Sequence, residues 1–177
     1  MADFVHLHNH SEYSLLDGLS RVEDIVTRAK ELGMKSIAIT DHGNMYGTIQ
    51  FYKECVAAGI KPIIGCEIYI AKRSRFDKTV DDKDYNHLIL LAKNLIGYKN
   101  LMKIISKSHL EAFYYKPRTD IELLREHSEG LICLSACVNG YVSEPLLNNQ
   151  EDEAKSRNFL TTFLELMQER HCFSRNR

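Results

Sequence analysis

The stretch GIKPIIGCEIYI, residues 59–70, decides the fold class. This apolar run follows a glycine and carries Pro62 near its start, so it is predicted to be a buried strand with the proline at its edge. Further strands are predicted at 3–8, 36–40, 87–92 and 131–137, and helices at 20–32, about 45–58, about 98–111 and 119–129. Repeated strand-then-helix units indicate an α/β protein with a parallel sheet, either open or closed into a barrel, and we favour the barrel.

Composition limits the class of protein further. The chain has 177 residues, of which 44% are apolar, so it can form one domain or a large part of one. Its net charge of -1 excludes a general basic field for nucleic acid, so any such contact must be local. Five cysteines without a CxxC pair favour a reducing compartment, the cytoplasm. We find no apolar run of membrane-spanning length and no signal peptide.

Residues that bind metals follow several of the predicted strands. These residues are His8 and His10, Asp41 and His42, Glu67, and Cys137, while Asp17 lies in a turn that can fold back toward them. Carboxyl ends of parallel strands meet at one edge, so these side chains are expected to meet there. His87 is also kept as a ligand, although it precedes its apolar run. Imidazole, carboxylate and thiolate together suit zinc, manganese or iron.

Other polar residues have two interpretations each. Asp41 is either a ligand or, as we favour, a group that caps a helix or orients a histidine. His6 is assigned to the core or to the surroundings of the ligands. Lys116 and Arg118, in YYKPRTD at 114–120, are candidates for contact with a substrate phosphate, because arginine offers a planar fork to phosphate oxygens. The alternative for both is a solvated loop. The charged stretch 72–86 is predicted to be a long surface loop.

Five motifs in order resemble the PHP (polymerase and histidinol phosphatase) domain, in the branch that begins bacterial replicative DNA polymerases. They are HLHNHSEYSLLDG at 6–18, AITDHGN at 38–44, GIKPIIGCEIYI at 59–70, NHLILLAKNLIGYKNL at 86–101 and YYKPRTDIELLREHSEGLICLSAC at 114–137. The resemblance implies a distorted α/β barrel with two to three divalent metal ions and a phosphoesterase site. It also implies 3′–5′ exonuclease proofreading in some members. The implied ligands are His8, His10, Asp17, His42, Glu67, His87 and Cys137, with Asp17, Glu67 and His10 nearest to catalysis.

The resemblance is clear over about residues 4–147, and the whole chain, 1–177, is interpreted as the N-terminal part of such a domain. The tail from 148 is either helix or a further strand. The family's last Asp-x-His pair and the polymerase domains are absent, so the chain alone is expected to be catalytically weak. The expected partners are the 3′ end of single-stranded DNA, the remainder of a polymerase chain and replisome subunits, with no membrane. The alternatives are a structural brace for the polymerase and a free-standing phosphatase.

Overall fold

The computed structural model describes residues 4–150, 152 and 153. Most of the predicted tail therefore lies outside the described residues. The helices are α1 (Val22–Glu31), α2 (Thr48–Ala58), α3 (Leu95–Leu110), α4 (Ile121–Glu126) and α5 (Ser143–Leu147), with a short 3-10 helix η1 (Val80–Asp82). The strands are β1 (Ser36–Ile39), β2 (Lys61–Ala71), β3 (Tyr85–Ala92), β4 (Phe113–Tyr114), β5 (Lys116–Thr119) and β6 (Leu131–Leu134).

The long strand β2 organises the sheet. Its first half pairs with β1 in parallel, and its second half pairs with β5 in parallel on the same side. Its other side pairs with β3, which is antiparallel and places Tyr69 opposite His87. Strand β6 then pairs antiparallel with β3, and β4 pairs antiparallel with β5. The sheet order within the described residues is β4-β5-β2-β3-β6, with β1 attached to β2.

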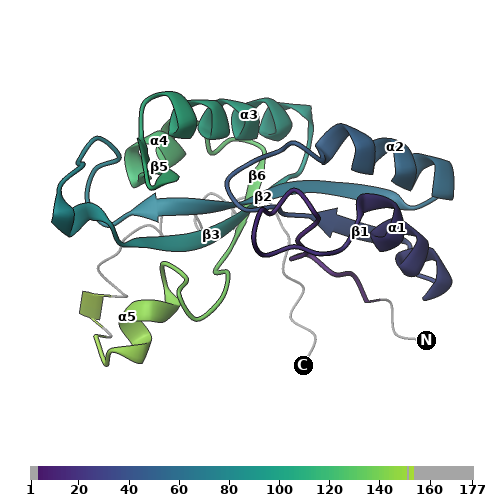
Figure 1. Cartoon of the computed structure of the whole chain (residues 1–177), viewed down its shortest axis with the longest axis horizontal. Coiled ribbons are helices and arrows are strands. Elements are labelled where there is room, and N and C mark those ends of the chain that lie inside the picture. The colour runs from purple at the N-terminus through teal and green to yellow at the C-terminus, as the bar shows by residue number, and fades with distance from the viewer. Residues whose placement is uncertain (1–3, 151, 154–177) are drawn as a thin grey trace.

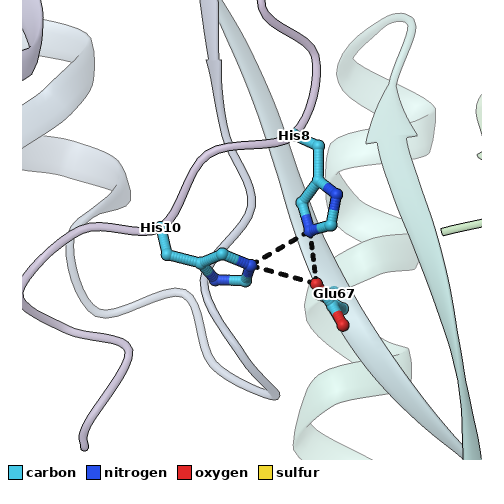
Figure 2. Close-up of side chains that lie close together, drawn as sticks. All are labelled: His8, His10 and Glu67. Carbon is cyan, nitrogen blue, oxygen red and sulfur yellow. Dashed lines mark hydrogen bonds and ion pairs between the residues drawn. The ribbon is translucent and has the colours of Figure 1, made fainter. Parts of the chain in front are cut away.

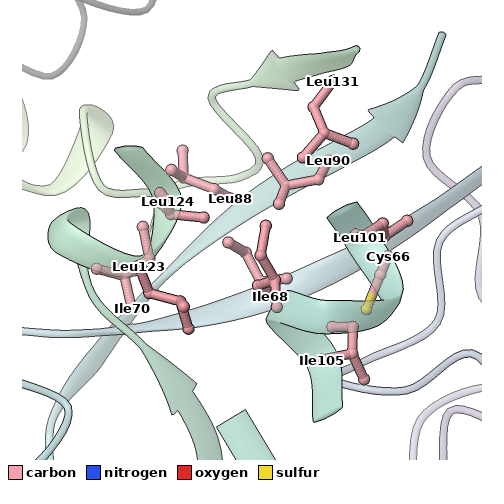
Figure 3. Packing of buried hydrophobic residues seen from close by; sticks show 11 residues of the cluster. Cys66, Ile68, Ile70, Leu88, Leu90, Leu101, Ile105, Leu123, Leu124 and Leu131 are labelled. Atoms are coloured by element: carbon pink, nitrogen blue, oxygen red, sulfur yellow. The ribbon is translucent and has the colours of Figure 1, made fainter. Parts of the chain in front are cut away.

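Alternation along β2 separates the core from the site. Cys66, Ile68 and Ile70 point to one face, where they pack with residues of β3, α3 and α4 (Figure 3). Figure 1 shows α3 and α4 covering this face, with α5 on the opposite side of the sheet. Glu67 and Tyr69 therefore point to the other face, because successive side chains of a strand alternate. A second apolar cluster joins α1, β1 and α2 around Phe51.

The structure corrects the predicted parallel sheet. The α/β class is confirmed, but the sheet is mixed, because β3 and β6 each run antiparallel to their sheet neighbour. A parallel return needs a crossover, usually a helix, and the segment 72–84 between β2 and β3 contains only the 3-10 helix η1. The chain therefore turns back beside β2. Among the described strands, β4 and β6 occupy opposite ends of the order, and no barrel closure is observed.

The first predicted strand is also wrong in detail. Within 4–10 no strand is formed, although the segment lies beside β1 through Ala38 N–H to the His6 carbonyl (3.0 Å) and Thr40 N–H to the Asn9 carbonyl (2.9 Å). Between these two hydrogen bonds the segment advances three residues, from His6 to Asn9, while the facing chain advances two, from Ala38 to Thr40. Regular strand pairing therefore fails. Side chains replace part of the pairing: Asn9 N–H donates to the Thr40 hydroxyl, which donates to the Asn9 carbonyl, both at 2.9 Å.

No helix among the described residues combines the length and the apolar character that crossing a membrane requires.

Candidate metal centre

Glu67 lies at the centre of the site. Its side chain is almost fully buried, and one carboxylate oxygen, Oε2, lies 2.5 Å from His8 Nε2 and 3.1 Å from His10 Nε2 (Figure 2). The other oxygen, Oε1, lies 2.7 Å from His87 Nδ1 and 3.7 Å from His42 Nδ1. A carboxylate with histidines at each oxygen has the arrangement of a ligand that bridges two ions.

All seven predicted ligands come together in the structure. They form three overlapping groups, each with ligand atoms within 4.8 Å of one another: His8, His10 and Glu67; His10, Asp17 and His42; Glu67, His87 and Cys137. In the second group Asp17 Oδ2 lies 3.1 Å from His42 Nε2, and in the third Cys137 Sγ lies 3.8 Å from His87 Nδ1. Glu67 and His10 each belong to two groups, so the groups form one continuous centre.

The structure explains why His87 meets the other ligands although it does not follow a predicted strand. It lies near the start of β3 rather than at the end of a strand, which would place it far from the other ligands in a parallel sheet. Because β3 runs antiparallel to β2, its start lies beside the later half of β2, with His87 opposite Tyr69 and diagonal to Glu67. The antiparallel turn that contradicts the predicted sheet thus supports the predicted ligand.

The surroundings of the ligands control their charge. Burial by itself raises the pKa of Glu67, but hydrogen bonds from His10 and His87 outweigh burial and hold that pKa well below its usual range. Burial lowers the pKa of His42, which favours the neutral imidazole. Glu67 and His42 are thus favoured in the carboxylate and neutral imidazole forms that bind metal. For His10 burial lowers the pKa, but the hydrogen bond to Glu67 and the charges of the nearby carboxylates together outweigh burial and raise it, so metal binding there releases a proton.

The residues present fit a group of metal ions. His42 Nδ1 is buried and has no hydrogen-bond partner among the described residues. In addition, His8 Nε2 and His10 Nε2 lie only 3.0 Å apart and both face the same carboxylate oxygen. A cation would satisfy the orphaned nitrogen and the converging lone pairs, and the N, O and S donors suit zinc, manganese or iron.

Ser14 orients two of the histidines, and the sequence offers no signal for this role. The Ser14 hydroxyl donates to Asp41 Oδ1 at 3.1 Å and accepts from the His42 backbone N–H at 2.9 Å. His10 Nδ1 lies 2.9 Å from the same hydroxyl oxygen. Since that hydroxyl already donates to Asp41, His10 donates to it through Nδ1–H, which leaves Nε2 as the ring nitrogen that faces Glu67 and is positioned to bind a metal ion. Asp41 thus orients His10 through Ser14, in agreement with the interpretation favoured from the sequence.

Replacing Ser14 by alanine is expected to weaken metal binding by about 10- to 100-fold, the usual cost of losing a group that orients a ligand. The fold should persist, because the change removes one oxygen and leaves Ser11 bound to Asp41. Titration with Mn²⁺ followed by calorimetry measures the effect. Ser20→Ala, at an exposed position, is the matched control. Equal affinities in the two variants would contradict the role assigned to Ser14.

Strained backbone marks the site. In the described part of the chain four non-glycine residues have positive φ, and three of them directly precede a candidate site residue: Leu16 before Asp17, Tyr115 before Lys116, and Ala136 before Cys137. Left-handed φ costs an ordinary L-residue about 1 kcal/mol or more. Strain of this kind gathers at functional sites, where the surrounding structure holds it.

Tyr69 and Gly43 form the wall beside the ligands, which the sequence did not indicate. The Tyr69 ring is nearly parallel to that of His42, with centroids 5.8 Å apart. Gly43 has φ +61°, and a Cβ there would lie 2.8 Å from Pro117 Cγ and 2.9 Å from Tyr69 Cε2. Only glycine therefore allows β5 to approach this closely. His109 Nε2 also lies 2.8 Å from the Gly43 carbonyl.

The two residues predicted to contact a substrate phosphate, Lys116 and Arg118, differ in their positions in the structure. Lys116 is half-buried at the start of β5, with its Nζ 5.4 Å from the centroid of the Tyr69 ring. Arg118 is fully buried, so the structure contradicts its predicted contact with substrate. Its guanidinium donates to the carbonyls of Asp82 (2.8 Å), Asp77 (2.7 Å) and Arg75 (3.4 Å), and thereby holds the charged loop 72–84 against β5.

His6 also departs from its assignment. It is exposed, and its ring contacts that of Phe4 at 4.7 Å, so its assignment to the core is wrong. The irregular pairing of 4–10 with β1 is the physical reason, because it breaks the alternation that would have placed His6 on the face of His8.

Fold and site together define a mixed α/β domain with a candidate centre for more than one metal ion. The model of the family described as PHP domain matches residues 6–173, and the chain belongs to this family. The membership expected from the five motifs is thereby confirmed.

Curated proteins are similar in sequence to most of this chain. It is 56% identical over 155 residues to "DNA polymerase III subunit alpha" of Borreliella burgdorferi, covering 86% of this chain and 14% of that protein. It is 54% identical over 154 residues to the protein of that name from Treponema pallidum, covering 86% and 13%. The chain thus spans a small part of these relatives. A solved amidohydrolase from Chromobacterium violaceum aligns with a TM-score of 0.45 and 20% identity, covering 60% of this chain and 33% of that one.

Proposed function

We propose that this domain is a metal-dependent phosphoesterase that releases nucleotides from the 3′ end of single-stranded DNA, as the PHP region of a replicative DNA polymerase III alpha subunit. The observation that carries the proposal is the convergence of seven ligand-type side chains around the buried carboxylate of Glu67. A structural brace has no chemical need for such a centre. The relatives' name supports DNA as the substrate.

The proposed roles follow from position and exposure. Divalent ions, when bound, activate water and neutralise the charge on a phosphate ester. Glu67, with both oxygens among histidines, would hold two to three zinc, manganese or iron ions together, with His8, His87 and Cys137 as further ligands. His10 is held by Ser14 with Nε2 toward the centre.

The residues proposed to be catalytic are Asp17, Glu67 and His10. Asp17 is the most accessible of them, because its side chain is 55% exposed, and its Oδ2 lies 3.1 Å from His42 Nε2. It can therefore reach both the metal centre and a substrate. Lys116 would contact a phosphate of the substrate, because its ammonium lies over the Tyr69 ring beside the ligands.

The proposal includes the surroundings of the domain. Its partners would be DNA, the remainder of a polymerase chain and replisome subunits in the cytoplasm. The four cysteines among the described residues are free thiols, which supports a reducing compartment. The distorted barrel remains part of this proposal, supported by β6, whose described pairing uses only the side facing β3.

An exonuclease assay on the domain together with the remainder of the proposed polymerase chain tests the proposal. With Mn²⁺ and 5′-labelled single-stranded DNA, the wild type should release nucleotides from the 3′ end and hydrolyse little histidinol phosphate. Asp17→Asn should lower the rate by about 100-fold or more, because a ligand is lost directly. Asp24→Asn, at an exposed position of α1, is the control.

The outcomes separate the alternatives. Metal binding without hydrolysis of either substrate would identify a structural brace. Preferential hydrolysis of histidinol phosphate would identify a phosphatase of the free-standing type. Both results overturn the proposal.

A further inference from the structure

Tyr115 occupies an unusual position at the tip of the β4–β5 hairpin. Phe113 pairs with Pro117 and Tyr114 with Lys116, so Tyr115 alone makes the turn. Its φ is +59°, a conformation that glycine adopts more readily than tyrosine. Its side chain is nevertheless 63% exposed, so core packing does not explain the bulky ring.

One cation lies near this ring, and a second belongs to the following residue. Lys83 Nζ lies 5.9 Å from the centroid of the Tyr115 ring, and Lys116 is the next residue along the chain. Neither lysine has a carboxylate within 4.0 Å of its Nζ among residues 4–150. An exposed aromatic ring with one uncompensated ammonium near it, and a second on the following residue, has the composition of a single-stranded nucleic-acid contact.

Lys116, next to the hairpin tip, lies close to the metal centre. Lys116 Nζ lies 5.4 Å from the Tyr69 ring centroid, and that ring is nearly parallel to His42 and lies 5.4 Å from the ring of His87. Gly43 lets Pro117 approach the Tyr69 ring, and β5 pairs with β2 at Tyr69. One aromatic ring therefore separates the ammonium of Lys116 from two candidate ligands.

We propose that Tyr115 stacks on a nucleobase close to the 3′ end of single-stranded DNA, while Lys83 and Lys116 contact the adjoining phosphates. This inference rests on the proposed function and adds a subsite to it. A binding role for this exposed ring gives a reason for the positive φ at Tyr115, which a glycine would relieve. A small phosphate ester has no need for such a stacking surface beside the site.

Photocrosslinking locates the contact without relying on hydrolysis. Oligothymidylates carrying 5-iodouracil at one of the last four positions are irradiated with the chain in EDTA, and the linked peptide is mapped by mass spectrometry. The crosslink is expected at Tyr115 when the iodouracil is at one of these positions. A crosslink confined to other residues would overturn the inference.

Binding measured by fluorescence anisotropy, also in EDTA, gives the second readout. Tyr115→Gly should weaken affinity about tenfold, the size of one lost base–aromatic stack, while Tyr115→Phe should stay within about twofold. Tyr52→Ala, at an exposed position on α2, is the control. Lys116→Gln should reduce the slope of affinity against salt by about 0.7, the value for one phosphate contact on a single strand.

The controls exclude misfolding and separate the two proposals. Tyr115→Gly relieves the positive φ, so its melting temperature should not fall. Equal affinities for wild type and Tyr115→Gly would overturn the subsite, even if the exonuclease assay succeeds. A Tyr115 crosslink together with absent nucleotide release would uphold the subsite and overturn the exonuclease proposal.

Discussion

Replacing Glu67 by glutamine is expected to remove more than half of the bound divalent metal. Each carboxylate oxygen faces two histidines, so this residue takes part in two of the three ligand groups. Glutamine keeps the size of the side chain but offers one oxygen and a donor –NH₂ group, which cannot bridge ions. Loss of a group that only orients a ligand costs about 10- to 100-fold, so loss of the ligand itself should cost more.

Elemental analysis after dialysis against Mn²⁺ or Zn²⁺ measures this effect. Glu31→Gln is the matched control, because Glu31 is exposed on α1 and forms a surface ion pair with Arg28 in the described part of the chain. Circular dichroism in EDTA checks that the Glu67 variant folds. If the variant keeps the metal content of the wild type, the assignment of Glu67 as the bridging ligand is wrong.

Replacing Arg118 by methionine is expected to lower the free energy of unfolding by about 3 kcal/mol or more. The guanidinium bonds to three backbone carbonyls of the 72–84 loop, and methionine would leave these groups without their donor. At a typical urea dependence, this change moves the unfolding midpoint down by about 1–2 M.

Limited trypsin digestion gives an independent measure of the same contact. The loop offers Lys72, Arg73, Arg75, Lys78 and Lys83 as cleavage points. We expect slow cleavage there in the wild type and rapid cleavage in Arg118→Met. Arg28→Met should change neither readout, because its exposed pair with Glu31 contributes about 1 kcal/mol at most. A stable, protease-resistant Arg118 variant would show that other contacts hold the loop.

The sequence by itself determined the identity of the candidate ligands and the family. Strand-end positions made His8, His10, His42, Glu67 and Cys137 candidates, and the resemblance to the PHP family implied the full set of seven, with Asp17 and His87, that the fold brings together. Alternation along β2 also follows from the sequence, since apolar residues at every second position bury one face and leave Glu67 on the other. These properties depend on local pattern, which the order of residues encodes directly.

Strand direction and the supporting contacts were decided only by the tertiary structure. Whether β3 runs parallel or antiparallel depends on how the 72–84 loop packs, and Arg118, 34 positions or more away, is part of that packing. The same holds for Ser14, which meets Asp41 and His42 from 27 and 28 positions away. Such contacts join residues that share no local pattern, so only the folded chain reveals that Arg118 supports a loop and that Ser14 orients a ligand.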